Sequence, residues 1–178
     1  RDLRMSRGLG DVYKRQECYN VFYGTLNFII QREEIYMNRT ALRETVFKVL
    51  FRYGFHDSES FASQMNLFFA EYPESGDEEE NWPALDSKSA EEITGKVTDI
   101  LCHIDEIDKV ISEKSEGWDI DRIGKAELSI MRIAVYEILY DDNIENAVSI
   151  SEAVKLAKKY GDEKAYGFVN GVLAKIVK

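Results

Sequence analysis

From residue 37 onward, apolar residues recur every three or four positions, the spacing that places them on one face of an α-helix. The first two periodic segments cover 39–53, which stops before Gly54, and 58–72, which stops before Pro73. No segment after residue 37 alternates convincingly between apolar and polar residues. The pattern therefore predicts an all-helical fold.

A strict heptad seam occupies the middle of the chain. Isoleucine and valine alternate by four and three residues, at positions 93, 97, 100, 104, 107 and 111. Such a seam suits packing against near-antiparallel helices. It predicts either one long helix or a broken pair of helices that share the seam.

The C-terminal third predicts three more helices. Segment 125–140 is apolar on almost every side, which is typical of a helix at the centre of a bundle. The next helix ends at Tyr160, with Asn143 or Asn146 as its N-cap, and Asp162 can cap the last one. We expect the last helix to bury one apolar stripe, formed by Tyr166, Val169, Leu173, Ile176 and Val177. We also expect Gly167 and Gly171 to let a neighbouring backbone approach this helix closely. The predicted fold is a compact bundle of about six to seven helices.

The first 36 residues differ from the rest, because they carry no apolar periodicity. Residues 6–16, SRGLGDVYKRQ, resemble the translation of an adapter used in preparing sequencing libraries. Residues 32–34 can be encoded by a purine-rich stretch that resembles a bacterial ribosome-binding site before Met37. We interpret 1–36 as a non-native extension, adapter plus upstream read-through, and 37–178 as the folded domain. The alternative is a real N-terminal arm whose YNVFYGTLNFII packs as a short strand.

Composition limits what the domain can do. A length of 178 residues favours a single domain, and the formal charge of −10 argues against a protein that coats nucleic acid through bulk electrostatics. Residues 37–178 alone carry −11. Any contact with nucleic acid must then be local. The chain has no apolar run of membrane-spanning length and no signal-peptide pattern, so we expect no membrane association and a cytoplasmic location.

Catalytic and metal-binding motifs are not apparent. His103 lies beside Cys102, about 100° away around a helix, so the two side chains do not aim at one metal. Two cysteines cannot build a disulfide framework or a cysteine-only zinc site. The carboxylates fall in an acidic run at 77–80 and on outer helix faces, where charge usually serves solvation. We expect no enzyme activity, no metal and no cofactor.

Four segments, in this order along the chain, carry a resemblance to a known family: IGK at 123–125, MRIAVYE at 131–137, SEAVKLAK at 151–158 and FVNGVL at 168–173. The spacing Arg39-x-x-x-Arg43 in the first predicted helix adds to the resemblance. Together they resemble the NusB family of bacterial transcription antitermination factors, and the length from Met37 fits as well. The resemblance implies an all-helical, NusB-like RNA-binding domain without enzyme activity. Its implied partners are boxA-type single-stranded RNA, the small-subunit ribosomal protein NusE and the transcription elongation complex on ribosomal RNA operons.

The candidate site residues follow in part from the residues themselves. Arg39 and Arg43 lie one turn apart, about 40° around a helix, so both guanidinium groups can face one phosphate strand at the positive helix N-terminus. The alternative is a pair of ordinary solvated arginines. Thr40 stands where the family commonly has a second adjacent arginine, which should weaken RNA binding. The resemblance further implies that Lys164 lies near RNA and that Glu127 faces the ribosomal protein.

Other polar and aromatic residues receive structural interpretations. Asn170 lies in an apolar stripe, so we expect a buried amide that is satisfied by backbone. Tyr53, Phe55 and Tyr166 offer stacking faces, but aromatic residues at helical spacing are more often core.

Two other functions stay open. One is a stand-alone helical RNA-binding module related to those of ribosomal RNA methyltransferases. The other is a self-associating structural bundle whose dimer interface is the seam from Ile93 to Ile111.

The interpretation of residues 1–36 predicts that they contribute nothing to the fold. A chain that starts at Met37 should melt at the same temperature as the full chain, because no packed element has been removed. Thermal denaturation of both forms by circular dichroism measures this, and a clear loss of stability in the shorter form would show that the N-terminal segment packs.

Overall fold

The computed structural model describes residues 37–56, 58–73 and 83–177. Within these ranges the chain forms seven α-helices, one short 3-10 helix and no strand, which confirms the all-helical bundle. The elements are α2 (Arg39–Tyr53), α3 (Ser58–Glu71), α4 (Ser87–Cys102), α5 (Ile104–Lys114), the 3-10 helix η2 (Ile120–Arg122), α6 (Lys125–Tyr140), α7 (Asn146–Tyr160) and α8 (Ala165–Ile176).

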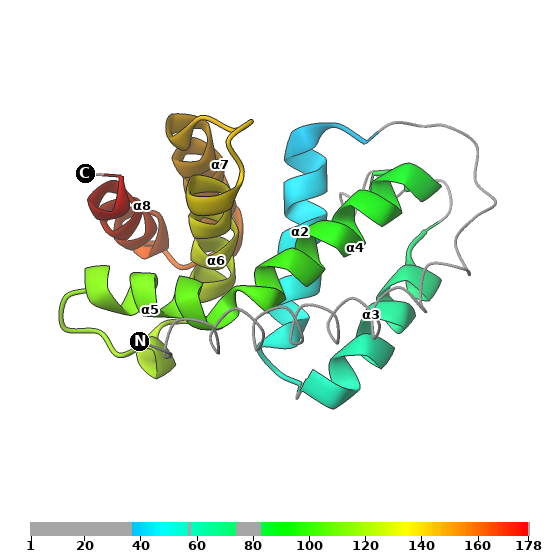
Figure 1. Cartoon of the computed structure of the whole chain (residues 1–178), viewed down its shortest axis with the longest axis horizontal. Coiled ribbons are helices and arrows are strands. Elements are labelled where there is room, and N and C mark those ends of the chain that lie inside the picture. The colour runs from blue at the N-terminus through cyan, green and yellow to red at the C-terminus, as the bar shows by residue number, and fades with distance from the viewer. Residues whose placement is uncertain (1–36, 57, 74–82, 178) are drawn as a thin grey trace, which may run out of the picture.

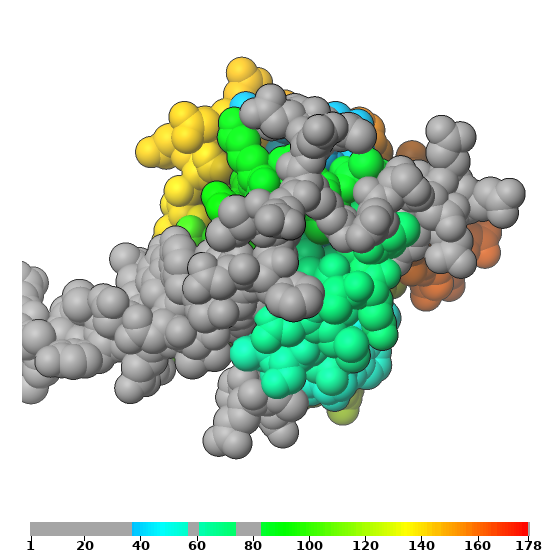
Figure 2. All heavy atoms as spheres, turned by 90° about the vertical axis from the view of Figure 1, so that its right-hand side faces the viewer, coloured from blue at the N-terminus to red at the C-terminus, as the bar shows by residue number. Residues whose placement is uncertain are grey.

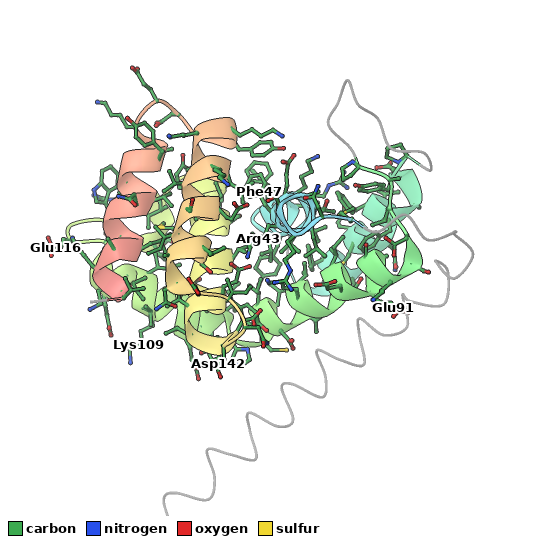
Figure 3. The ribbon with its side chains drawn as sticks, turned by 90° about the horizontal axis from the view of Figure 1, so that it is seen from above. Arg43, Phe47, Glu91, Lys109, Glu116 and Asp142 are labelled. Carbon is green, nitrogen blue, oxygen red and sulfur yellow. The ribbon has the colours of Figure 1, made fainter. Side chains whose placement is uncertain are left out.

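Helix α2 lies between two groups of helices (Figure 1). It packs against α3 and α4 on one side and against α6 on the other. Helix α6 in turn contacts α5, α7 and α8, as expected for a helix that is apolar on almost every side. Seen from above, α2 appears end-on between the α7–α8 pair and the α3–α4 pair (Figure 3). Figure 2 faces the end of the molecule that lies on the right of Figure 1, where α3 is in front and α4 lies above it.

The heptad seam belongs to a broken pair of helices, α4 and α5. His103 separates them: its backbone N–H bonds to the carbonyl oxygens of Asp99 and Ile100, and its ring Nδ1 lies 2.7 Å from the Asp99 oxygen. The seam is nonetheless continuous in burial, since five of its six residues are fully buried: Ile93, Val97, Ile100, Ile107 and Ile111. The break lets one repeat serve both groups of helices within a single chain.

No helix of the described residues is long and apolar enough to cross a membrane.

Two helix starts differ from the expected caps. Neither Asn143 nor Asn146 caps α7, because Glu145 takes the N-cap position and makes no side-chain cap bond. The Asp162 side chain accepts the backbone N–H of Lys164 at 2.8 Å, one turn before α8 begins. Asp162 therefore closes the turn before the helix and does not cap it.

The buried stripe of α8 is narrower than expected. Val169 and Leu173 are buried, but Tyr166 and Val177 are exposed, and so is Asn170, which was expected to be buried. A Cβ on Gly167 or Gly171 would meet no described atom within 4 Å, so no neighbouring backbone uses these glycines. The reason is position: α8 lies at the edge of the bundle and packs on α5, α6 and α7 from one side only. Its other face is left to solvent.

A buried ionic cluster joins four of the helices. The Glu137 side chain of α6 is only 1% exposed and accepts hydrogen bonds from the Arg43 Nε at 2.8 Å, from the Lys96 Nζ at 2.6 Å and from the Ser149 hydroxyl at 2.8 Å. The cluster thus connects α6 with α2, α4 and α7. A buried carboxylate is tolerated only when its charge is compensated and its oxygen lone pairs are occupied. Two cations and a hydroxyl meet both needs here.

This cluster makes Arg43 structural, and its removal should be costly. We expect Arg43→Ala to lower the free energy of unfolding by about 3–5 kcal/mol, because it leaves a buried carboxylate short of one partner. Lys155→Ala is the matched control, since it removes an ion pair whose lysine is well exposed and should change stability by less than about 1 kcal/mol. Urea denaturation of both variants measures the difference, and equal losses would show that Glu137 does not depend on Arg43.

Candidate nucleic-acid interface

The first element of the candidate site is the N-terminus of α2. Asn38 begins the helix, and its side-chain oxygen accepts the backbone N–H of Ala41 at 2.9 Å. Arg39 follows directly and is exposed. No carboxylate of the described residues forms an ion pair with it. An uncompensated guanidinium at the positive end of a helix attracts anions, phosphate included.

Arg43 does not share this exposed edge, and our expectation of one face for both arginines is wrong. The residue is 5% exposed, and its guanidinium is held by Glu137, with Glu152 at 3.9 Å from Nη1. The physical reason is that α2 is enclosed on two sides, so the arc that it presents to solvent is narrow. A rotation of about 40° between positions four residues apart is enough to take Arg43 inside. Figure 3 shows Arg43 and Phe47 projecting from α2 toward the α7 side.

Thr40 is tied to the same cluster through Glu152. Burial alone would raise the pKa of this carboxyl group, but hydrogen bonds from Lys155 and Thr40 and the charges of Lys155 and Arg43 lower it below its usual value. Thr40 therefore holds the start of α2 against α7.

Lys164 and Glu127, which we expected to serve different ligands, line the same pocket. The pocket has a volume of about 290 Å³ and lies where η2, the start of α6 and the turn between α7 and α8 meet. Trp118 and Phe168 form its aromatic wall, with ring centroids 5.9 Å apart, and Arg122 adds a second cation. Trp118 is 53% exposed although it is one of the largest apolar side chains. Phe168 is half-buried, so the exposed ring of Trp118 is the part of this wall on which a nucleic-acid base can stack, with Arg122 and Lys164 and the carboxylates of Glu127 and Asp162 lining the same pocket.

Glycines let Glu127 reach into this pocket. A Cβ on Gly124 would collide with the Glu127 carboxylate. A Cβ on Gly161 would collide with the side chain of Ala165 and would lie 2.8 Å from the carbonyl oxygen of Ala157. The half-buried Glu127 side chain is therefore held between the start of its own helix and the turn that carries Lys164.

Charge is distributed unevenly along the neighbouring surface. Lys155 and Lys159, on the outer face of α7, are paired with Glu152 at 2.6 Å and with Glu44 at 2.9 Å. Glu44 also accepts a hydrogen bond from the Tyr160 hydroxyl, and burial, together with this bond, raises the pKa of Tyr160. Lys158 and Lys164 form no ion pair with any described carboxylate. Among the described residues, this edge of an acidic protein thus carries three cations without an ion pair, Arg39, Lys158 and Lys164.

Sequence reasoning missed the aromatic part of this site. Trp118 marked only a helix break, and Phe168 belonged to a family motif without an assigned role. The available signal was a tryptophan in a polar segment, where no helical stripe accounts for it. Of the aromatic residues weighed for stacking, Phe55 and Tyr166 are exposed, contrary to expectation, whereas Tyr53 is half-buried against Phe61.

No group of three or more His, Cys, Asp or Glu side chains in the described ranges could hold a metal ion.

Fold and site together define a small all-helical domain with a local basic and aromatic edge. The comparisons with known proteins agree with this class. The family model that matches is that of the NusB family, over residues 40–178. The transcription antitermination protein NusB of Agathobacter rectalis is 47% identical over 139 residues, which cover 78% of this chain and 98% of that protein. The corresponding protein of Ruminiclostridium cellulolyticum is 39% identical over 142 residues, covering 80% of this chain and 90% of its own length.

Solved structures give the same result. NusB of T. maritima superposes with a TM-score of 0.63 at 30% identity, covering 80% of this chain and 92% of that one. A chain from the crystal structure of the antitermination factors NusB and NusE in complex with double-stranded RNA superposes with a TM-score of 0.58 at 31% identity, covering 78% and 94%. The chain belongs to the NusB family.

Proposed function

We propose that this chain is a transcription antitermination factor that binds boxA-type RNA together with ribosomal protein NusE and so promotes processive transcription of ribosomal RNA operons. The observation that carries the proposal is the similarity to a NusB chain whose solved structure contains both NusE and RNA. It acts within the transcription elongation complex, in the cytoplasm, and catalyses no reaction.

The RNA contact is assigned to two places on one edge. Arg39 contributes a phosphate contact at the start of α2, and Lys164 contributes another beside the pocket. Within the pocket, Trp118 and Phe168 provide the stacking face for an unpaired base. Arg43 acts as a positioning residue: its buried pairs with Glu137 and Glu152 fix the helix turn that carries Arg39.

The protein contact is assigned to Glu127. Ribosomal proteins are generally basic because they neutralise RNA phosphate, so an acidic binder is steered toward one by charge. Glu127 lies in the same pocket as Lys164, which places the two proposed interfaces next to each other. A local role is the alternative, since a glutamate in the first turn of α6 also favours the helix dipole.

The two other functions are less well supported. A dimer built on the seam from Ile93 to Ile111 would need exposed residues, and most of the seam is buried within this one chain. A role as an RNA-modification module lacks a matching observation, whereas the relatives that this chain covers almost completely are antitermination proteins.

The RNA assignment predicts separate effects on affinity and on salt dependence. Arg39→Ala and Lys164→Ala should each weaken binding of a labelled single-stranded boxA RNA and lower the slope of log affinity against log salt by about 0.7 to 1, because each removes one phosphate contact. Trp118→Ala should weaken binding with little change in slope. Lys109→Ala is the control, an exposed lysine on α5 away from this edge. Fluorescence anisotropy across a salt series provides both quantities; wild-type values for all three variants would refute the assignment.

The partner assignment predicts a kinetic defect. Glu127→Lys should leave the melting temperature nearly unchanged and slow association with NusE, and the defect should shrink as salt is raised because screening removes the steering. Glu163→Lys alters the net charge of the protein by the same amount at an exposed residue in the turn before α8, and so serves as the control for net charge. Stopped-flow association rates measure the effect. A variant that associates at the wild-type rate in low salt but melts earlier would make Glu127 a helix-end residue only.

A further inference from the structure

Helix α7 occupies the surface between the two proposed RNA contacts. Its N-terminal half lies beside the start of α2, since Thr40 bonds to Glu152. Its C-terminal end lies beside Glu44 of α2 through Lys159 and Tyr160, and stops at Gly161 next to the pocket. From position 152 to position 161 a helix rises by about 14 Å. The outer face of α7 therefore offers a path for an RNA strand that touches both Arg39 and Lys164.

Among the described residues, one cation on this face, Lys158, forms no ion pair. Lys155, Lys158 and Lys159 are all exposed and are spaced so that they share one side of the helix. Carboxylates compensate Lys155 and Lys159, as described above, but Lys158 is paired with none of the described ones. Its Nζ lies 5.4 Å from the ring centroid of Tyr166.

Tyr166 completes the feature, because it is 45% exposed at the first turn of α8 and no hydrogen bond holds its hydroxyl among the described residues. The ring is wide, partly solvated and already adjacent to a cation. Base stacking on such a ring is tolerant of sequence, and a neighbouring lysine can bind the phosphate of the stacked nucleotide.

We propose that Lys158 and Tyr166 form a second RNA subsite, in which the tyrosine ring stacks one unpaired base and the lysine binds an adjacent phosphate. The inference rests on the proposed function and deepens it: single-stranded RNA runs from Arg39 along α7, across this subsite and into the pocket of Trp118 and Phe168. Asp162 and Glu163 lie in the turn before α8, whereas Lys158 lies on α7, where Lys155 and Lys159 are compensated by Glu152 and Glu44. Continuity with the proposed contacts at both ends favours RNA over an acidic protein segment.

The test uses the full chain and a fluorescein-labelled single-stranded boxA RNA in anisotropy titrations over a salt series. Tyr166→Ala should weaken binding by about 5- to 150-fold, which corresponds to the loss of one stacked base. Tyr166→Phe keeps the ring and should stay within about twofold of wild type. Lys158→Ala should lower the salt slope by about 0.7, the value for one phosphate contact on a single strand.

Matched variants separate this subsite from general effects. Tyr140→Ala removes an exposed tyrosine from the end of α6, and Lys109→Ala removes an exposed lysine from α5. Both should bind RNA as wild type does. Melting curves of all variants are recorded, and Lys158→Glu, a surface change that cannot remove core packing, tests the subsite even if Tyr166→Ala is unstable; it should weaken binding more than Lys158→Ala.

The outcomes are distinguishable from those of the proposed function. If Trp118→Ala weakens RNA binding while the Lys158 and Tyr166 variants bind as wild type, the proposed function stands and this subsite is wrong. If those variants slow NusE binding and leave RNA affinity unchanged, the surface binds protein and the inference is equally wrong. If the wild-type chain binds the RNA neither alone nor with NusE present, the proposed function itself fails.

Discussion

The buried carboxylate of Glu137 is the constraint on which the arrangement of the helices depends. It lies on the central helix, and its oxygen atoms are occupied by groups from α2, α4 and α7. Apolar packing is tolerant of small shifts, but a buried charge requires its partners at hydrogen-bond distance. The cluster therefore specifies how α2 is rotated, and so which of its residues face solvent. The rotation of α2 that buries Arg43 against Glu137 leaves Arg39 facing solvent.

The same constraint explains how an acidic protein keeps a basic edge. Most cations near α2 and α7 are used internally: Arg43 by Glu137, Lys155 by Glu152 and Lys159 by Glu44. The cations that are left, such as Arg39 and Lys164, lie at helix ends, where no carboxylate of the described residues pairs with them. Phosphate affinity is then concentrated at a few points on the surface, while the remaining charge stays negative and suits a basic protein partner.

Much of the fold was predictable from local signals. The bounds of α2 and α6 match the expected 39–53 and 125–140, because their apolar spacing is regular and glycine or polar segments flank them. The burial of Arg43 was not predictable, since its main partner is 94 residues away and an arginine counts as polar in any periodic pattern. The exposure of Tyr166 and Asn170 depends on α8 being an edge helix, which is a property of the assembled bundle. Lys164 and Glu127 came from the family resemblance, yet their common pocket forms only when the turn at 161–164 meets the start of α6.

The contact of Glu127 with Gly124 and Gly161 has an evolutionary consequence. At position 124 the exclusion of a side chain comes from Glu127 alone, so a shorter residue at 127 would relieve it and permit alanine there. At position 161 the carbonyl oxygen of Ala157 and the side chain of Ala165 also block a Cβ, so that glycine is required whatever residue occupies 127. Substitutions at 124 and 127 are thus epistatic, whereas position 161 is constrained independently of Glu127. Lineages that change the acidic residue would be free to drift at the first glycine and not at the second.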